Sequence, residues 1–278
     1  MKAVARSELR IQYSGLIIFT AQIISVATGM AFILLLTRNL STPQYGVWSN
    51  IFDLTGYFLL FSSFIPFWAT RFVARGEEGA AKTALLTNVI LATTSAAIYI
   101  PLVPIMTGGL HISQTYIAIY LLASAQIITL PLINVLESCL RAQKPQAVGY
   151  GLLIEEACKL ALAYTLIVRF QQPILGAMLS LILSASFQAF YYLRLLSKDL
   201  REKIRWNYIR EWLKGSTAIL YNSVGAQLAA FVFILLLIYG SQEARADYQA
   251  AATSSWRCKR FNQIITKDLI RPCLEEVI

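Results

Sequence analysis

Long apolar segments separated by short polar ones dominate the chain. Seven of them reach the length of about 20 residues that a helix needs to cross a hydrocarbon core about 30 Å thick. They are Gly15–Leu36, Val47–Ala69, Leu85–Met106, Tyr116–Leu136, Val148–Val168, Ile174–Leu193 and Ala218–Tyr239. Because unpaired backbone groups find no water in hydrocarbon, each span is predicted to be an α-helix. The pattern therefore predicts an all-α, polytopic membrane protein with about seven transmembrane helices.

The composition agrees with lipid as the main solvent of this chain. Hydrophobic residues make up 57% of its 278 residues and charged residues only 14%, whereas soluble domains carry about 25% charged residues. The net charge is +9, a value that in a soluble protein would suggest nucleic-acid binding. Here the basic residues lie between the apolar spans, so membrane topology and contact with membrane lipids explain them better, and no nucleic-acid partner is expected.

The basic residues also predict the orientation. One side of the predicted topology holds fifteen of them: Lys2, Arg6, Arg10, Arg71, Arg75, Lys82, Arg141, Lys144, Arg194, Lys198, Arg201, Lys203, Arg205, Arg210 and Lys214. The other side, up to residue 250, holds only Arg38, Arg169 and Arg245. Lysine and arginine accumulate in cytoplasmic loops. We therefore expect a multi-pass protein of the cell membrane with a cytoplasmic N-terminus.

A short internal repeat suggests how the spans are organised. The sequence FILLL occurs at Phe32–Leu36 in the first span and again at Phe233–Leu237 in the seventh. Six spans followed by a copy of the first are what a transporter built of two similar halves would show. We expect a six-helix bundle over residues 1–195, a cytoplasmic amphipathic linker over 196–215, a seventh helix over 216–240 and an atypical tail over 241–278.

The linker and the tail carry expectations of their own. In the linker, Leu200, Ile204, Tyr208 and Trp212 are spaced four apart with basic residues between them. This spacing predicts an interfacial helix on the inner leaflet with its tryptophan and tyrosine at headgroup depth; a solvated connector is the alternative. Five basic residues crowd residues 257–271 of the tail on what should be the outer side, so a truncated or frame-shifted product is expected there.

Motifs of catalysis are absent from the sequence. It contains no glycine-rich phosphate loop, no GxSxG and no HExxH, the local patterns by which common enzyme classes are recognised. The four cysteines form no CxxC pair, which argues against a zinc site and a disulfide framework. We expect no enzyme activity, no metal and no cofactor.

Polar residues inside the spans are the candidate functional groups, because such residues usually face a bundle interior or a wet cavity. The second span contains Asp53, either a counter-charge in a cavity or a hydrated residue near the interface. The fourth contains Gln126, Asn134 and Glu137, which with Thr129 fall on one stripe of a helix. That stripe serves either helix packing or a substrate path, and Asn222 in the seventh span allows the same two interpretations.

The fifth span, GLLIEEACKLALAYTL, carries the most charge. Glu155 and Lys159 are four residues apart in the favourable order for a pair on one helix face, and such a pair would hold the bundle together. Glu156 points about 100° away, which leaves it as the surplus carboxylate. An unpaired carboxylate in this setting would protonate or find a partner, and a proton- or cation-coupled step is one possible consequence.

Two segments resemble a known family. LLTRNLSTPQYGVWS, at Leu35–Ser49, looks like the loop between the first two helices of polysaccharide-type flippases, with Arg38, Leu40, Pro43, Tyr45 and Gly46 at the matching positions. WATRFVARGEEGAAKT, at Trp68–Thr83, resembles the same family through Arg71, Val73 and Ala74. These flippases belong to the multidrug/oligosaccharidyl-lipid/polysaccharide exporter (MOP) superfamily, and the resemblance covers roughly residues 10 to 255.

The resemblance implies two six-helix bundles around a cavity that opens alternately to each side of the membrane. It implies flipping of a polyprenyl- or dolichol-linked oligosaccharide for surface glycan synthesis, with a second half or glycosyltransferases as partners. By this analogy the chain is the first bundle plus one helix, so we expect the 278 residues alone not to flip and a chain extended by a second half to flip. Two alternatives stay open: a non-transporting partner or assembly subunit, and a multidrug exporter of the same superfamily.

Overall fold

The computed structural model describes residues 2–109, 112–217, 219–221, 224–225, 227–228 and 231, with side chains from Tyr13 onward. Regular structure in this part of the chain is helical throughout, which confirms the predicted all-α class. The elements are α1 (Lys2–Asn39), α2 (Thr42–Leu59), α3 (Ile65–Ala74), α4 (Ala80–Gly109), α5 (Ile117–Gln143), α6 (Pro145–Ala163), α7 (Pro173–Leu195) and α8 (Asn207–Gly215). A π-helical turn, Tyr164–Arg169, extends α6. Most of the predicted seventh span, together with the tail, lies outside the described residues.

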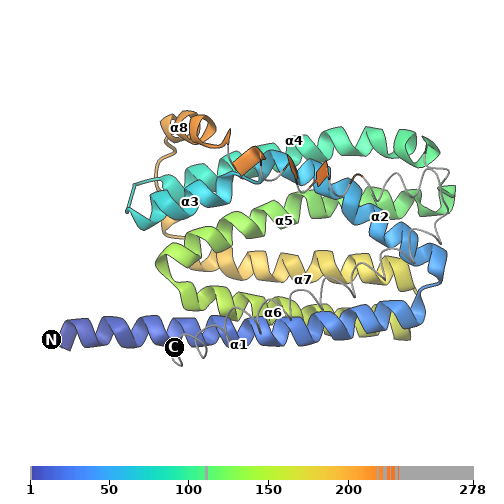
Figure 1. The fold of residues 1–278 in the computed structure, drawn as a ribbon, viewed down its shortest axis with the longest axis horizontal. Coiled ribbons are helices and arrows are strands. Elements are labelled where there is room, and N and C mark those ends of the chain that lie inside the picture. The colour runs from blue at the N-terminus through green and yellow to red at the C-terminus, as the bar shows by residue number, and fades with distance from the viewer. Residues whose placement is uncertain are drawn as a thin grey trace, which may run out of the picture.

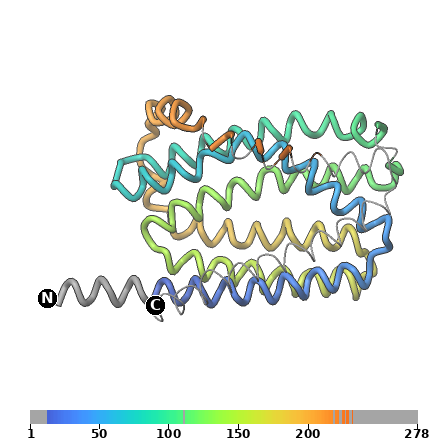
Figure 2. Tube along the Cα trace, in the orientation of Figure 1, coloured from blue at the N-terminus to red at the C-terminus, as the bar shows by residue number. Residues whose placement is uncertain are grey.

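The long helices run roughly side by side and form one bundle (Figure 1). In the view of Figure 1, α4 lies at one edge and α1 at the other, with α5, α7 and α6 between them, while α2 and α3 slant across α5. The tube view shows the same stacking (Figure 2). The closest pairing of separate elements is that of α1 with α6, so the charged fifth span is covered by the first.

Four described helices are long and apolar enough to cross a membrane: Tyr13–Asn39, Ala80–Gly109, Gln114–Gln143 and Pro173–Leu195. The segments Thr42–Ser62 and Ile65–Ala74 meet the same test together, as a pair bent by 42°. The sequence predicted one continuous second span, Val47–Ala69, and the structure corrects it to this broken pair. Helix α6 lies in the bundle with the others (Figure 1), although its three charged residues make it less apolar.

The break between α2 and α3 has a local cause. Pro66 stands near the start of α3, where a proline is tolerated because the first turn of a helix leaves its N–H groups unpaired. The hydroxyl of Ser62 donates to the carbonyl of Leu59 at 3.1 Å, and that of Ser63 donates to the carbonyl of Leu60 at 2.8 Å. These bonds satisfy carbonyls at the end of the first segment, so the break can exist inside a membrane bundle.

The polar loops sort to two ends of the bundle. The N-terminal end of α1, the α3–α4 loop, the α5–α6 turn and the segment after α7 all lie at one end (Figure 1). The turns that carry Arg38 and Arg169 lie at the other. The structure thus keeps the basic residues that the sequence assigned to one side together, while the cytoplasmic location of that side stays a prediction.

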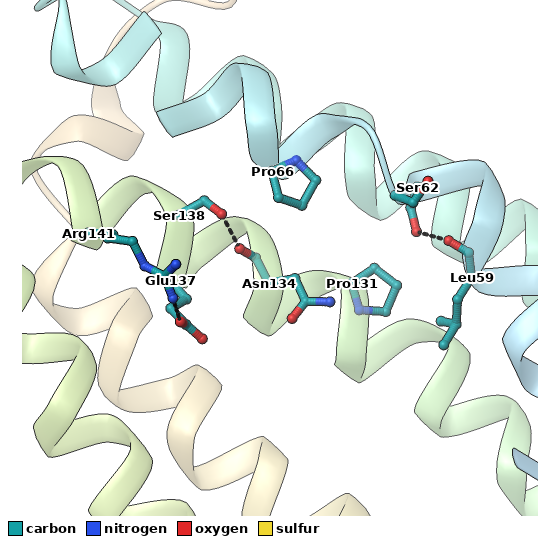
Figure 3. Close-up of a pocket in the computed structure, with 9 residues that line it drawn as sticks. Leu59, Ser62, Pro66, Pro131, Asn134, Glu137, Ser138 and Arg141 are labelled. Atoms are coloured by element: carbon teal, nitrogen blue, oxygen red, sulfur yellow. Dashed lines mark hydrogen bonds and ion pairs between the residues drawn. The ribbon is translucent and has the colours of Figure 1, made fainter. Parts of the chain in front are cut away.

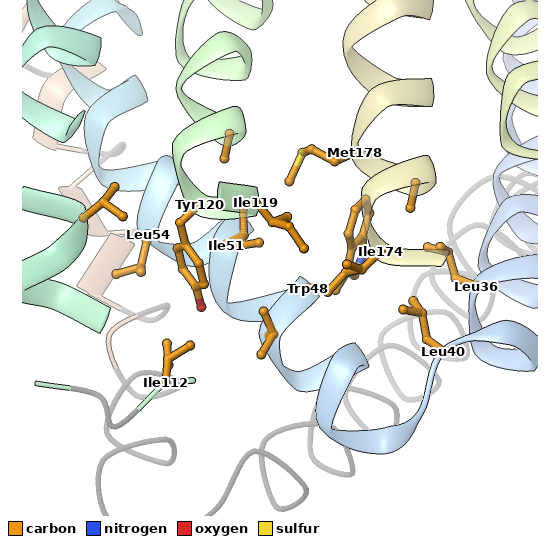
Figure 4. Packing of buried hydrophobic residues seen from close by; sticks show 14 of the residues in the cluster. Leu36, Leu40, Trp48, Ile51, Leu54, Ile112, Ile119, Tyr120, Ile174 and Met178 are labelled. Carbon is orange, nitrogen blue, oxygen red and sulfur yellow. The ribbon is translucent and has the colours of Figure 1, made fainter. Parts of the chain in front are cut away.

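Two apolar clusters fill the bundle, one toward each end. The first joins α1, α2, α4, α5 and α7 near the turns that follow α1, α4 and α6, and it includes Trp48, Tyr120 and Met178 (Figure 4). The second lies toward the basic end and includes Phe72, Tyr192 and the fully buried Trp212 of α8. The two clusters account for most of the buried apolar side chains in the described part of the bundle.

The linker differs from its prediction. Its only regular helix of more than one turn is α8, which begins at Asn207, whereas the spacing predicted amphipathic helix from Leu200 onward. Trp212 is fully buried in the protein, with its ring edge-on to Phe72 and 5.5 Å between centroids, while its depth in the membrane stays a prediction. The ring of Tyr208 lies 5.0 Å from the same phenylalanine. The periodicity marked the apolar face of α8 correctly, but the bundle covers that face.

Candidate functional site

A polar cleft opens where the broken α2–α3 pair faces α5 (Figure 3). Its volume is about 410 Å³. The residues that line it come from the end of α2, the break, the start of α3 and the second half of α5: Leu59, Ser62, Ser63, Pro66, Pro131, Asn134, Glu137, Ser138 and Arg141. The cleft therefore lies where α2–α3 bends against α5, with the exposed Asn134 and Arg141 on its open side.

Two prolines and their neighbouring hydroxyls shape this cleft. Pro66 and Pro131 approach it from opposite helices (Figure 3); Pro131 lies inside α5 and removes a helix hydrogen bond there, whereas Pro66 is in the first turn of α3. The hydroxyl of Ser138 donates to the carbonyl of Asn134 at 2.7 Å. Since the cleft's serines are used to satisfy backbone carbonyls, the groups best placed to bind a ligand are the amide of Asn134, the carboxylate of Glu137 and the guanidinium of Arg141.

Glu137 and Arg141 form an ion pair one helical turn apart on α5. The Arg141 side chain is 61% exposed and that of Glu137 is 25% exposed, so the pair lies at the mouth of the cleft. An exposed pair of this kind contributes little to stability, about 0–1 kcal/mol. Breaking this ion pair therefore costs little free energy, so a ligand phosphate could replace Glu137 at Arg141, or a ligand ammonium could replace Arg141 at Glu137.

A second polar cluster lies between α1 and α6. Glu156 is 4% exposed and Lys159 is 9% exposed, and the Lys159 ammonium is 2.6 Å from the Glu156 carboxylate. The hydroxyls of Ser25 and Thr28 on α1 donate to the two oxygens of the same carboxylate, at 2.7 and 2.6 Å. Lys159 also lies 6.0 Å from the ring centre of Phe32. The cluster is closed and well satisfied, which is typical of a clamp between helices.

This cluster overturns the predicted pairing of the fifth span. Lys159 pairs with Glu156, three residues away, and the expected Glu155–Lys159 ion pair is wrong. Both carboxylates lie within reach of the lysine along the helix, but only Glu156 faces the hydroxyl donors of α1. Glu155 is half-buried and lies within ion-pair distance of no cation among the described residues, although Lys159 is its strongest electrostatic neighbour, ahead of Glu156 and of Glu137 on α5. The surplus carboxylate is therefore Glu155.

The other predicted residues lie apart from the cleft. Asp53 is half-buried on α2, and Gln126 is 3% exposed on α5; neither lines the cleft, so the predicted stripe on the fourth span reaches it only through Asn134 and Glu137. Arg71 is exposed near the end of α3, with its guanidinium 4.2 Å from the ring centre of Phe67. Asn222 lies outside the described residues.

Sequence reasoning missed several residues of the site. Ser62 and Ser63 sit in a stretch that resembles an ordinary apolar span, and Arg141 was counted only for topology. The signal that could have found them is the pair of prolines, Pro66 in the second predicted span and Pro131 in the fourth. A proline inside a span frees backbone groups that must be satisfied nearby, so serines beside it indicate a local break.

Comparison with solved structures identifies membrane transporters of similar fold. The chain is similar to a multidrug resistance MATE family transporter of the MOP superfamily in its outward-facing conformation (TM-score 0.65, 16% identity, 91% of this chain and 60% of that chain). It is also similar to a MOP superfamily transporter from Pyrococcus furiosus (TM-score 0.61, 18% identity, 89% of this chain and 60% of that chain). A MATE transporter from Vibrio cholerae in its bent form matches with a TM-score of 0.58 at 18% identity, over 89% and 61%.

These matches establish the fold that MATE transporters of the MOP superfamily share. They do not single out the polysaccharide branch that the sequence resembles. The chain spans about 60% of the length of the transporters it matches. No family model and no curated protein matches the sequence.

Proposed function

We propose that this chain forms one helical bundle of a membrane transporter whose cargo is a lipid-linked oligosaccharide. The observation that carries the proposal is the cleft between α2–α3 and α5, a polar opening in a bundle with the MOP transporter fold. The resemblance of Leu35–Ser49 and Trp68–Thr83 to polysaccharide flippases supports the choice of cargo. The transporters of similar fold are described as MATE or MOP superfamily transporters with no glycan cargo named, so the choice of cargo is left to be tested.

The chemistry of the cleft suits such a cargo. A polyprenyl-linked oligosaccharide presents phosphate groups beside sugar hydroxyls. The guanidinium of Arg141 matches the geometry of phosphate oxygens, while the amide of Asn134 and the carboxylate of Glu137 can bind hydroxyl groups. The ion pair of Glu137 with Arg141 would open as the phosphate takes the arginine, leaving the carboxylate free to accept from a sugar.

Export of a cationic drug is the second candidate, and one observation favours it. Glu155 has no ion pair among the described residues, and Glu137 needs only to release Arg141 to become a second free carboxylate. An organic cation would be attracted to these two groups. The two candidates thus depend on opposite partners in the same pair: the oligosaccharide on Arg141 and the drug on Glu137.

Equilibrium binding to the purified chain in lipid nanodiscs distinguishes them. For the oligosaccharide, Arg141→Gln should weaken binding of a fluorescent polyprenyl pyrophosphate oligosaccharide about tenfold, as expected for one charged hydrogen-bonded contact of about 1.5 kcal/mol. Glu137→Gln should change it much less. If ethidium binds, and Glu137→Gln weakens its binding more than Arg141→Gln does, the drug exporter is supported. Binding of neither ligand would contradict both candidates and favour the non-transporting partner.

A further inference from the structure

Two arginines on α3 are held in place by aromatic rings instead of carboxylates. The guanidinium of Arg71 lies 4.2 Å from the ring centre of Phe67 and 5.9 Å from that of Trp68. The guanidinium of Arg75, one turn later, lies 5.9 Å from the ring centre of Phe72. Stacking on a ring uses the face of the guanidinium and leaves its in-plane N–H donors available.

These donors have no acidic partner in the described part of the chain, where the ion pairs involve only Arg141, Lys159 and Arg205. Four carboxylates lie at this end, of Glu77, Glu78, Asp199 and Glu202. Glu78 pairs with Arg205 at 3.3 Å, Glu77 accepts from the Tyr208 hydroxyl at 3.3 Å, and Glu202 accepts from the Gly79 N–H; none of the four forms an ion pair with Arg71 or Arg75. Arg71 lies in the last turn of α3 and Arg75 is the residue that caps the helix four positions later, so the two arginines lie on one side of its end. The result is a preorganised pair of cations at the basic end of the bundle.

Helix α8 extends this basic surface. It packs on the same part of α3: the Trp212 ring meets Phe72, and the indole of Trp68 donates to the Ser216 hydroxyl at 3.0 Å. Its exposed charged residues are Arg210, Glu211 and Lys214, of which the two basic ones lie four apart. Trp206 (56% exposed) and Leu213 (55% exposed) lie on the same short segment, and Phe67 of α3 is 41% exposed.

We propose that this α3–α8 rim, made of Arg71, Arg75, Arg210 and Lys214 with the exposed apolar residues beside them, binds the phosphate of an anionic phospholipid of the leaflet at the basic end of the bundle. Basic clusters next to a membrane span attract anionic lipids by about 1 kcal/mol per residue. Tryptophan is enriched at headgroup depth, and phenylalanine and leucine are typical of the apolar face that an interfacial helix inserts into the membrane. The rim thus combines charge complementarity with apolar anchors, and this inference does not depend on the cargo of the cleft.

The test compares two double variants of the full chain that lose the same charge. Arg71→Gln with Arg75→Gln removes the stacked pair. Arg194→Gln with Lys198→Gln is the matched control, since these basic residues are also exposed, four apart and at the same end, with Arg194 stacked at 4.9 Å on Phe190. Binding of phosphatidylglycerol and of phosphatidylcholine is titrated by native mass spectrometry in detergent, and circular dichroism checks that each variant folds.

The wild type should prefer phosphatidylglycerol, and the double variant at 71 and 75 should weaken that binding about tenfold or more, since each basic residue near an anionic headgroup contributes about a fivefold effect. The control variant at 194 and 198 should lose much less of its affinity for phosphatidylglycerol. The variant Arg71→Lys with Arg75→Lys, which keeps both charges, should retain part of that affinity. Equal losses in the two glutamine variants would overturn the site. Displacement of the lipid by inorganic phosphate alone would show a general anion site and overturn its assignment to phospholipid.

Discussion

Breaking the buried pair of Glu156 and Lys159 should destabilise the bundle by an amount that the structure allows us to bound. Lys159→Met leaves the Glu156 carboxylate 4% exposed and without its cation. Removing one partner of a buried pair costs about 3–5 kcal/mol. Here the hydroxyls of Ser25 and Thr28 stay within 2.7 Å of the carboxylate and offset part of that cost, since hydrogen bonds to charged groups contribute about 1.5–3 kcal/mol each. We expect a net loss of about 2–3 kcal/mol.

A double-mutant cycle measured by unfolding in sodium dodecyl sulfate isolates the pair. Glu156→Gln combined with Lys159→Met should recover most of the loss, with a coupling energy of about 2 kcal/mol. The matched cycle uses the adjacent carboxylate, Glu155→Gln with Lys159→Met, and should give a coupling of about 0.5 kcal/mol or less, as for a poorly aligned pair. A larger coupling for Glu155 than for Glu156 would refute the assignment of the ion pair and restore the pairing that the sequence suggested.

Two further predictions concern the loop of α3–α4 and the topology. Gly79 has φ of +75° and an added Cβ would lie 2.0 Å from the Lys203 carbonyl, whereas Gly76 has φ of +74° and open space around it. Gly79→Ala should therefore expose the linker to limited proteolysis, while Gly76→Ala should cost only about 1 kcal/mol of backbone strain; equal proteolysis of the two would contradict the docking of the linker. Reporters fused at Lys144 should read cytoplasmic and those at Gly108 external, and a cytoplasmic signal at Gly108 would overturn the predicted orientation.

The sequence was a good guide to the long helices and a poor one to their partners. Apolar runs of the right length located α1, α4, α5 and α7, because hydrocarbon permits little else than a helix, although α1 begins well before the predicted Gly15 and α5 continues past the predicted Leu136 to Gln143. The break after Leu59 was not predicted: hydropathy averages over serines such as Ser62. Proline tolerance in membrane helices also hides whether Pro66 kinks a span or ends it.

In the candidate site, too, the sequence identified polar residues but not the residues that they contact. Spacing along α6 allowed Lys159 to reach Glu155 or Glu156, and the choice was made by hydroxyls of α1 that are far away in sequence. The cleft likewise depends on two helices that cross at an angle, so Asn134 and Glu137 were identified but not Ser63. Side chains that act across helices become visible only when the packing is known.

Photocrosslinking of the cargo tests the central proposal most directly. A benzophenone amino acid placed at Asn134, in the cleft, is compared with one placed at Leu183, which is 40% exposed on α7. With a labelled polyprenyl pyrophosphate oligosaccharide in nanodiscs, we expect a crosslink at position 134 that unlabelled oligosaccharide suppresses, and only weak, unsuppressed labelling at 183. Equal labelling at both positions, or labelling at 134 that ethidium but not the oligosaccharide suppresses, would contradict a glycan path through the cleft.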